Sequence, residues 1–168
     1  MKTLLVLRHA KSSWKDDTLD DHDRPLNKRG KKIAPLMGKL IAKQNVVPDL
    51  ILSSTAKRAR STAKRAAKAM GYKGDIIYEP ALYLAEPSAY FKAIRDCANT
   101  QDRVMIIGHN PGLESLVQTM TGMDKPLPTA ALAEVQLTIQ SWKGLKRNTK
   151  GKLCNLWIPR NAVSVRPS

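Results

Sequence analysis

Two histidines and two arginines stand just after apolar runs of the sequence. Arg8 and His9 follow TLLVL, Arg58 comes shortly after LILSS, and His109 follows VMIIG. Guanidinium groups bind phosphoryl oxygens through paired hydrogen bonds, and helix amino ends present further donors to the same oxygens. This combination of residue types therefore indicates a site for a phosphoryl group.

The apolar runs predict buried strands at 2–7, 50–54 and 103–107. Ligands of open α/β sheets bind beyond the carboxyl ends of the parallel strands. Because Arg8, His9, Arg58 and His109 all follow strand ends, we expect them to meet in one crevice. A helix that begins near residue 55 would place Arg58 in its first turn, at that crevice.

Each of these residues also has a purely structural interpretation. A lone histidine at a strand end is more often held by the backbone than used in chemistry, but His9 has Arg8 beside it and a second strand-end histidine in the chain. Arg24 could be a solvated loop residue; we expect it at the site, whereas we expect His22 to be solvated. We expect no metal, because the histidines lack an acidic or cysteine partner at metal-ligand spacing.

The remaining pattern predicts an α/β protein with a mostly parallel sheet that helices cover on both faces. A further strand is expected at 75–78. Helices are expected from the cap Asn27 to about residue 44, from the cap Thr55 to Met70 with a stop at Gly71, over 88–98, and from the cap Asn110 to Met120. Segments 132–139 and 153–158 predict a terminal hairpin, antiparallel, joined by a basic loop.

Composition narrows the class of protein. The 168 residues suit one domain over 1–168, and Cys97 and Cys154 are too far apart in sequence for a paired motif, which favours a reducing, cytoplasmic location. No apolar run is long enough to span a membrane. The net charge of +15 indicates an anionic partner, such as an acidic protein, a phosphorylated substrate or a nucleic acid. Aromatic residues make up only 5%, which disfavours nucleic acid.

Five segments occur in an order that resembles a known family: LLVLRHAKS, DRPLNKRG, ILSSTAKRARSTA, VMIIGHNPGL and PTAALAEV. They resemble the histidine phosphatase superfamily, specifically its short SixA-type phosphohistidine phosphatase branch. The likeness runs from Lys2 to about Ile139. It implies a three-layer α/β/α sandwich, in agreement with the alternation of strands and helices.

The resemblance also implies roles for the strand-end residues. His9 would be the nucleophile that becomes phosphorylated, and Arg8 and Arg58 would bind the phosphoryl oxygens. His109 would complete the pocket, and Arg24 in DRPL would contact phosphate or position its loop. As a nucleophile, His9 must be neutral, which the surrounding cations favour, whereas His109 is expected to be a protonated donor. No metal or organic cofactor is implied.

One position departs from the pattern of larger superfamily members, which carry an acidic proton donor after the third strand. Leu84 stands at that position here, and Glu79 and Glu86 nearby are equally well explained as ordinary loop carboxylates. Imidazole leaves phosphorus more readily than an alkoxide does, so a site without the acid suits phosphohistidine. We expect the segment near Tyr83 to be short and open, with room for a phosphorylated protein.

Other functions remain open at this point. The same residues could serve a phosphatase of small phosphomonoesters, while the short chain and the missing acid disfavour a phosphoglycerate mutase. A noncatalytic module that binds a phosphorylated partner or nucleic acid is a further alternative. The basic segment 143–152 could steer acidic substrates or be a solvated loop. We expect a monomeric protein.

Overall fold

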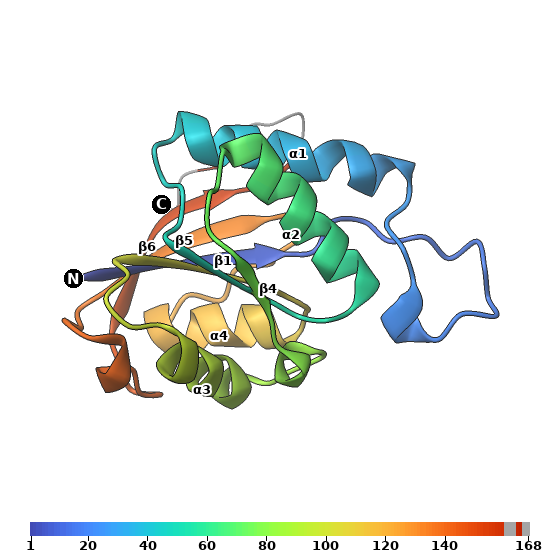
Figure 1. Ribbon diagram of the computed structural model, residues 1–168. Coiled ribbons are helices and arrows are strands. Elements are labelled where there is room, and N and C mark those ends of the chain that lie inside the picture. The colour runs from blue at the N-terminus through green and yellow to red at the C-terminus, as the bar shows by residue number, and fades with distance from the viewer. Residues whose placement is uncertain (160–163, 166–168) are drawn as a thin grey trace.

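One sheet organises the chain, as a computed structural model that describes residues 1–159 and 164–165 shows (Figure 1). Its strand order is β3-β2-β4-β1-β5-β6-β7. Strands β1 to β4 and β6 run in one direction and β5 and β7 in the other, so the expected mostly parallel sheet is confirmed. The strands are β1 (Lys2–Arg8), β2 (Leu50–Ser53), β3 (Ile76–Tyr78), β4 (Arg103–Gly108), β5 (Leu132–Leu137), β6 (Gly151–Trp157) and β7 (Ser164–Val165).

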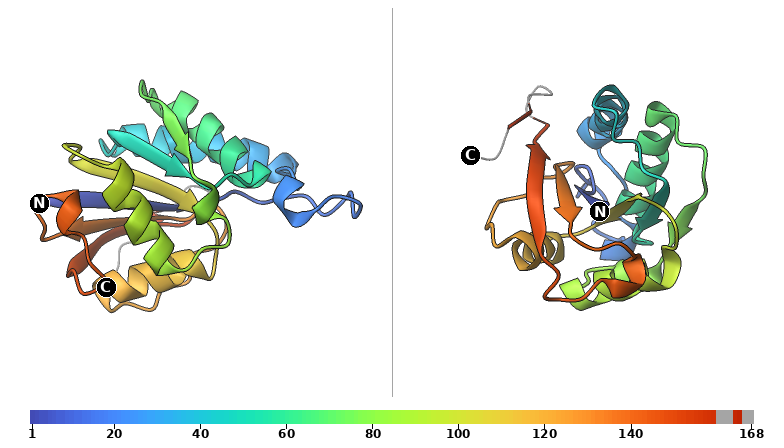
Figure 2. Two further views of the ribbon diagram at one scale, coloured as in Figure 1. Left: turned by 60° about the horizontal axis from the view of Figure 1, so that its bottom comes forward. Right: turned by 90° about the vertical axis from the view of Figure 1, so that its left-hand side faces the viewer.

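Helices cover both faces of this sheet and complete the three-layer α/β/α sandwich that we expected. Helices α1 and α2 pack on one face and α3 and α4 on the other, as the views of Figure 2 also show. They are α1 (Lys28–Lys43), α2 (Lys57–Met70), α3 (Pro87–Cys97) and α4 (Gly112–Thr121), with short 3₁₀ turns at Asp21–Asp23, Pro80–Leu82 and Trp142–Gly144.

The two faces of β1 explain why its sequence is a continuous apolar run. Leu4 and Val6 belong to the apolar cluster under α3 and α4, whereas Leu5 and Leu7 belong to the cluster under α1 and α2. Side chains alternate between the two faces of a strand, so a central strand covered on both sides has no polar position. The charged residue Arg8 therefore marks the end of the buried strand.

The ends of the helices agree in part with the sequence-based prediction. The Asn27 side chain accepts a hydrogen bond from the Gly30 amide at 2.8 Å, and Gly71 ends α2 with a φ of 75°. Two expected caps are wrong. Ala56 is the cap of α2, while the Asn110 side chain donates to the Leu127 carbonyl instead of capping α4.

The terminal hairpin is confirmed, with β5 and β6 antiparallel. Its connection holds Trp142, whose ring is buried and whose Nε1 donates to the Gln101 carbonyl at 2.5 Å. Leu137, the last residue of β5, pairs with Lys2 at the start of β1. The basic segment 143–152 that follows β5 therefore begins at the end of the sheet opposite to Arg8. No helix in the described part of the chain has the length and apolar character needed to cross a membrane.

Candidate active site

The pairing of β1 with β4 brings the two strand-end histidines together. Arg8 pairs with Gly108, so His9 and His109 are the first residues beyond two adjacent parallel strands. The His9 amide donates to the Gly108 carbonyl at 3.2 Å, and the two imidazole rings lie 5.1 Å apart between centroids. Both side chains are buried. The convergence expected from the sequence is thus a consequence of strand register.

All five residues predicted for the site line one cavity of about 320 Å³. Arg58 reaches it from the first turn of α2, and Arg24 from the loop between β1 and α1. Both arginines are buried, which is unusual for charged side chains and requires partners inside the protein. The lining consists of Arg8, His9, Lys11, Ser12, Trp14, Asp21, Arg24, Arg58, Leu84, His109, Asn110 and Thr129.

The hydrogen bonds of His9 determine which of its ring nitrogens is free. Nδ1 lies 2.7 Å from the Ala10 carbonyl, which only accepts, so Nδ1 carries the proton. Ala10 is held in turn by the Thr62 hydroxyl, at 2.9 Å from the Ala10 amide. Nε2 of the neutral ring therefore keeps its lone pair, as a nucleophile requires.

The surroundings of His9 also keep it neutral. Burial lowers the pKa of His9 to about 4; the hydrogen bond to Ala10 opposes this shift, and the positive charges of Arg58, Arg8 and Arg24 add to it. Desolvation and like charge both disfavour a second proton on the imidazole. The nucleophilic form of the ring is thus the ground state at neutral pH.

This low pKa predicts the pH dependence of both activity and stability. With a pKa of about 4 for His9, the reactive imidazole persists down to about pH 5, so kcat/KM should fall only in more acidic solution. The unfolded chain binds the same proton near pH 6.5, so the free energy of unfolding should decrease as the pH is lowered from about 6.5 toward 4. Imidazole ¹H–¹⁵N spectra recorded over this range measure the pKa directly. An acid limb near pH 6.5 that tracks the His9 resonances would contradict the prediction.

His109 differs from the expectation of a protonated donor. Burial, together with the neighbouring His9 and Arg58, lowers the pKa of His109 to about 3, so its ring is neutral in this structure. Its Nε2 lies 2.8 Å from the Ser54 hydroxyl, and its buried Nδ1 has no hydrogen-bond partner among the described residues. A neutral imidazole still provides one N–H donor, so His109 can bind a phosphoryl oxygen without a full charge.

Asp21 lines the cavity as well, although the sequence did not indicate it. Its Oδ2 accepts from Arg58 Nη2 at 2.9 Å and from the Tyr83 hydroxyl, and its Oδ1 accepts from Arg24 Nη1 at 2.9 Å. Arg58 Nη1 donates to the Asp21 backbone carbonyl at 2.6 Å. Burial opposes ionisation, but the hydrogen bonds from Tyr83, Arg58 and Arg24 outweigh it and hold the pKa of Asp21 well below its ordinary value.

The ionised Asp21 occupies guanidinium donors that a phosphoryl group would also use. We therefore expect Asp21→Asn to strengthen the binding of inorganic phosphate as a competitive inhibitor. The expected change in its inhibition constant is about fivefold, which corresponds to about 1 kcal/mol for one unit charge at 4 Å in water. Asp20→Asn is the matched control, because the Asp20 side chain is exposed and makes no capping hydrogen bond. Weaker phosphate binding in the Asp21 variant would show that the carboxylate only orients the arginines.

The segment after β3 covers the cavity more closely than expected. The Tyr83 ring packs edge-on against both His109 and His22, at centroid distances of 5.5 Å and 4.8 Å, so this segment is not open at Tyr83. Leu84 lines the cavity. The Glu79 side chain instead accepts from the Ala81 amide, and Glu86 is exposed on a neighbouring groove. Neither glutamate lines the cavity.

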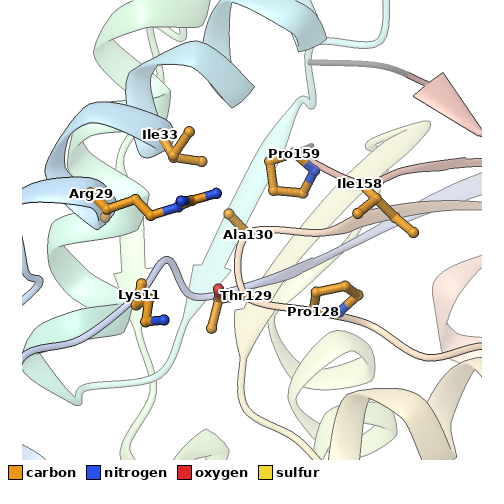
Figure 3. Close-up of a pocket in the computed structure, with 9 residues that line it drawn as sticks. Lys11, Arg29, Ile33, Pro128, Thr129, Ala130, Ile158 and Pro159 are labelled. Carbon is orange, nitrogen blue, oxygen red and sulfur yellow. The ribbon is translucent and has the colours of Figure 1, made fainter. Parts of the chain in front are cut away.

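A second cavity of about 180 Å³ adjoins the first and shares Lys11 and Thr129 with it. Figure 3 shows the Arg29 side chain extending from α1 along this cavity, opposite Pro159 and Ile158. Its wall thus combines two cations with apolar groups. The site accordingly offers room for more of a substrate than the phosphoryl group alone.

Comparison with known proteins supports the resemblance noted in the sequence. A model of the histidine phosphatase superfamily (branch 1) matches residues 4–83. A chloroplastic protein of Arabidopsis thaliana is 33% identical over 84% of this chain and 69% of its own length. The chain belongs to the histidine phosphatase superfamily.

Two solved structures relate this histidine phosphatase to SixA proteins. A protein assigned as the phosphohistidine phosphatase SixA of Agrobacterium tumefaciens is 31% identical and superposes with a TM-score of 0.80, over 94% of this chain and 98% of its own. The protein histidine phosphatase SixA in complex with tungstate is 20% identical, with a TM-score of 0.79 over 95% of this chain and 98% of its own. Together these findings assign the chain to the phosphatases, which are hydrolases.

Proposed function

We propose that this phosphatase removes the phosphoryl group from phosphohistidine in a protein, through a phosphorylated His9. The observation that carries the proposal is the state of His9: a neutral imidazole with Nδ1 bound to the Ala10 carbonyl and Nε2 free, in a cavity flanked by Arg8 and Arg58. An imidazole in this state is a nucleophile, and guanidinium groups stabilise the charge on transferring phosphoryl oxygens.

The reaction takes place in two steps. In the first, the lone pair of His9 Nε2 attacks phosphorus, and the bond from phosphorus to the substrate imidazole breaks, with its electron pair left on that nitrogen. The substrate ring enters with a proton on its other nitrogen, so it leaves as a neutral imidazole. In the second, water attacks the phosphorus of phospho-His9, the bond from phosphorus to Nε2 breaks with its electron pair returned to Nε2, and inorganic phosphate departs while one proton of the water leaves with solvent. Arg8 and Arg58 bind the oxygens in both steps, and His109 donates one hydrogen bond. Both steps balance without a metal or an organic cofactor.

The choice of phosphohistidine rests on the missing proton donor. An alkoxide leaving group gains about 10²- to 10⁴-fold in rate from a positioned acid, whereas an imidazole depends on it far less. Leu84, rather than a carboxylic acid, lines the cavity after β3. The carboxylate that does line it, Asp21, stays ionised because its pKa is held low, so it has no proton to donate.

Comparing two kinds of substrate tests the proposal. Turnover is measured on a protein phosphorylated on histidine and on alkyl phosphomonoesters of small molecules, under the same conditions. We expect kcat/KM to be at least about 100-fold higher on phosphohistidine, the lower end of what a general acid contributes. Equal or faster turnover of the alkyl esters would replace this proposal with a phosphatase of small phosphomonoesters.

A further inference from the structure

Among the four helices, exposed positive charge is concentrated on α1 and α2, whose layer is called the basic layer below. Every lysine and arginine of α1 is exposed, and so is every one of α2 except Arg58. Neither helix contains an aspartate or a glutamate. On the opposite face, α3 carries Asp96 beside its cations, and α4 carries Glu114 and no cation. The helices on one face of the sheet therefore carry a large excess of cations, whereas those on the other face do not.

Part of the basic layer borders a cavity of about 240 Å³ at the amino end of α2. Lys57, Arg60 and Lys64 line it from one side of the helix, with Thr55, Ser61 and the loop residues His22 and Asp23 around them. Residues at these spacings lie on the same side of a helix, and the three span about 10 Å along its axis. They form a short row of cations at the edge where the strands end.

This row of cations begins next to the active site. His22 Nε2 lies 2.9 Å from the Thr55 hydroxyl, and the His22 ring packs edge-on against Tyr83 at 4.8 Å. The Tyr83 ring also packs edge-on against His109, with a centroid distance of 5.5 Å. Tyr83 therefore contacts His22, which lines the cavity beside α2, and His109, which lines the catalytic cavity.

We propose that Lys57, Arg60 and Lys64 bind an acidic segment of the protein that carries the phosphohistidine, an inference that rests on the proposed function. An extended peptide advances about 3.3 Å per residue, so about three residues of substrate span the row. Carboxylates in that segment would meet three exposed cations of α2, a helix that contains no acid, with Asp23 as the carboxylate that lines the cavity beside them. The row would thereby select acidic proteins and accelerate their encounter with the active site.

The chemistry of this surface favours an acidic protein over nucleic acid. Single-stranded nucleic acids bind through aromatic side chains on which the bases stack. Neither α1 nor α2 contains an aromatic residue. The Tyr78 ring is near the row, and the guanidinium group of Arg60 already lies over one of its faces, 5.2 Å from the centroid. The row therefore offers charge without a stacking platform.

Two phosphohistidine peptides test the proposal, identical except that the residues flanking the phosphohistidine are glutamate in one and glutamine in the other. The wild-type enzyme should hydrolyse the glutamate peptide with a kcat/KM about tenfold higher at low ionic strength, and added salt should reduce the difference. The triple variant K57E/R60E/K64E should lose this preference or reverse it. Its kcat/KM on phosphoramidate, which is too small to reach the row, should stay within about twofold of wild type.

A matched triple variant separates this row from the overall charge. K39E/K43E/K68E makes the same charge change on the same layer, but near the carboxyl ends of both helices. It should retain the preference for the glutamate peptide. Equal losses in the two triple variants, or equal rates on the two peptides with the wild-type enzyme, would overturn the proposal.

Binding measurements distinguish failure of this inference from failure of the proposed function. Fluorescence anisotropy with the unphosphorylated glutamate peptide should show binding that weakens in K57E/R60E/K64E and not in K39E/K43E/K68E. If this result holds while no phosphohistidine substrate is hydrolysed, the docking surface stands and the proposed function fails. If a short RNA or DNA binds the same row more tightly than the peptide at physiological ionic strength, the surface belongs to nucleic acid and the inference is wrong.

Discussion

Replacing His9 by alanine should abolish phosphate release, with a loss of at least about 10⁴-fold in kcat, as expected when a nucleophile is removed. The variant lacks the Nε2 lone pair, and His109, the other histidine that lines the cavity, has its Nε2 2.8 Å from the Ser54 hydroxyl. Single-turnover assays by phosphorus NMR, or by mass spectrometry of quenched mixtures, should find a phosphoryl adduct on His9 in the wild type and none in the variant.

A second variant, His9→Gly, tests whether a loss of activity comes from the missing imidazole or from a failure to fold. His9→Gly leaves space for an imidazole, so added imidazole should restore part of the turnover, with the phosphoryl group passing to the free imidazole. Thermal unfolding of both variants reports whether the fold persists. Retention of most of the activity by His9→Ala would require a different nucleophile. If the wild type hydrolyses no substrate and binds phosphoprotein as tightly as His9→Ala does, the protein is a noncatalytic module.

Arg58→Ala should slow the reaction by roughly 10²- to 10³-fold in kcat, since a buried donor to the transition state contributes about 3 to 4 kcal/mol. Arg58 reaches the cavity from α2, and the removal of its guanidinium group leaves the phosphoryl oxygens with fewer charged donors. Arg58→Lys should recover only part of the loss, because an ammonium group keeps the charge but not the two parallel donors. Steady-state kinetics on one phosphohistidine substrate measures both variants.

Arg65→Ala is the matched control for Arg58, since Arg65 is an exposed arginine of the same helix. Its kcat should stay within about twofold of the wild-type value, as is usual for surface substitutions away from a site. A loss in the Arg58 variant that appears in KM with kcat unchanged would mean that this arginine binds ground state and transition state equally, contrary to the assigned role.

The strand ends account for how much of the site could be predicted from sequence. Arg8, His9 and His109 each directly follow an apolar run, and such runs are buried strands whenever helices cover both faces of a sheet. Because parallel strands end at the same edge, strand order was not needed to expect these residues together. The sequence predicted Thr55 as the cap of α2 and the structure has Ala56, yet Arg58 still lies in the first turn.

Asp21 and Tyr83 could not be predicted in the same way. The loop before α1 contains five aspartates, Asp16, Asp17, Asp20, Asp21 and Asp23, and no periodic pattern distinguishes one from another. Tyr83 lies in an irregular segment, where the direction of a side chain depends on the path of the backbone. Asp21 and Arg24 are three residues apart, a spacing that weakly indicates an ion pair between them. It does not indicate that this pair faces the cavity.

The chain by itself thus determined the layered α/β architecture, the residues at the strand ends and the excess of cations, because these depend on local periodicity and composition. Only the tertiary structure decided that β1 lies beside β4, which holds the His9 and His109 rings 5.1 Å apart. It also decided that one loop carboxylate pairs with Arg24 and Arg58, and that His109 is neutral instead of protonated. These properties arise from burial and from charges that are distant in sequence. Burial and distant charges cannot be inferred from the residues next to each histidine or aspartate.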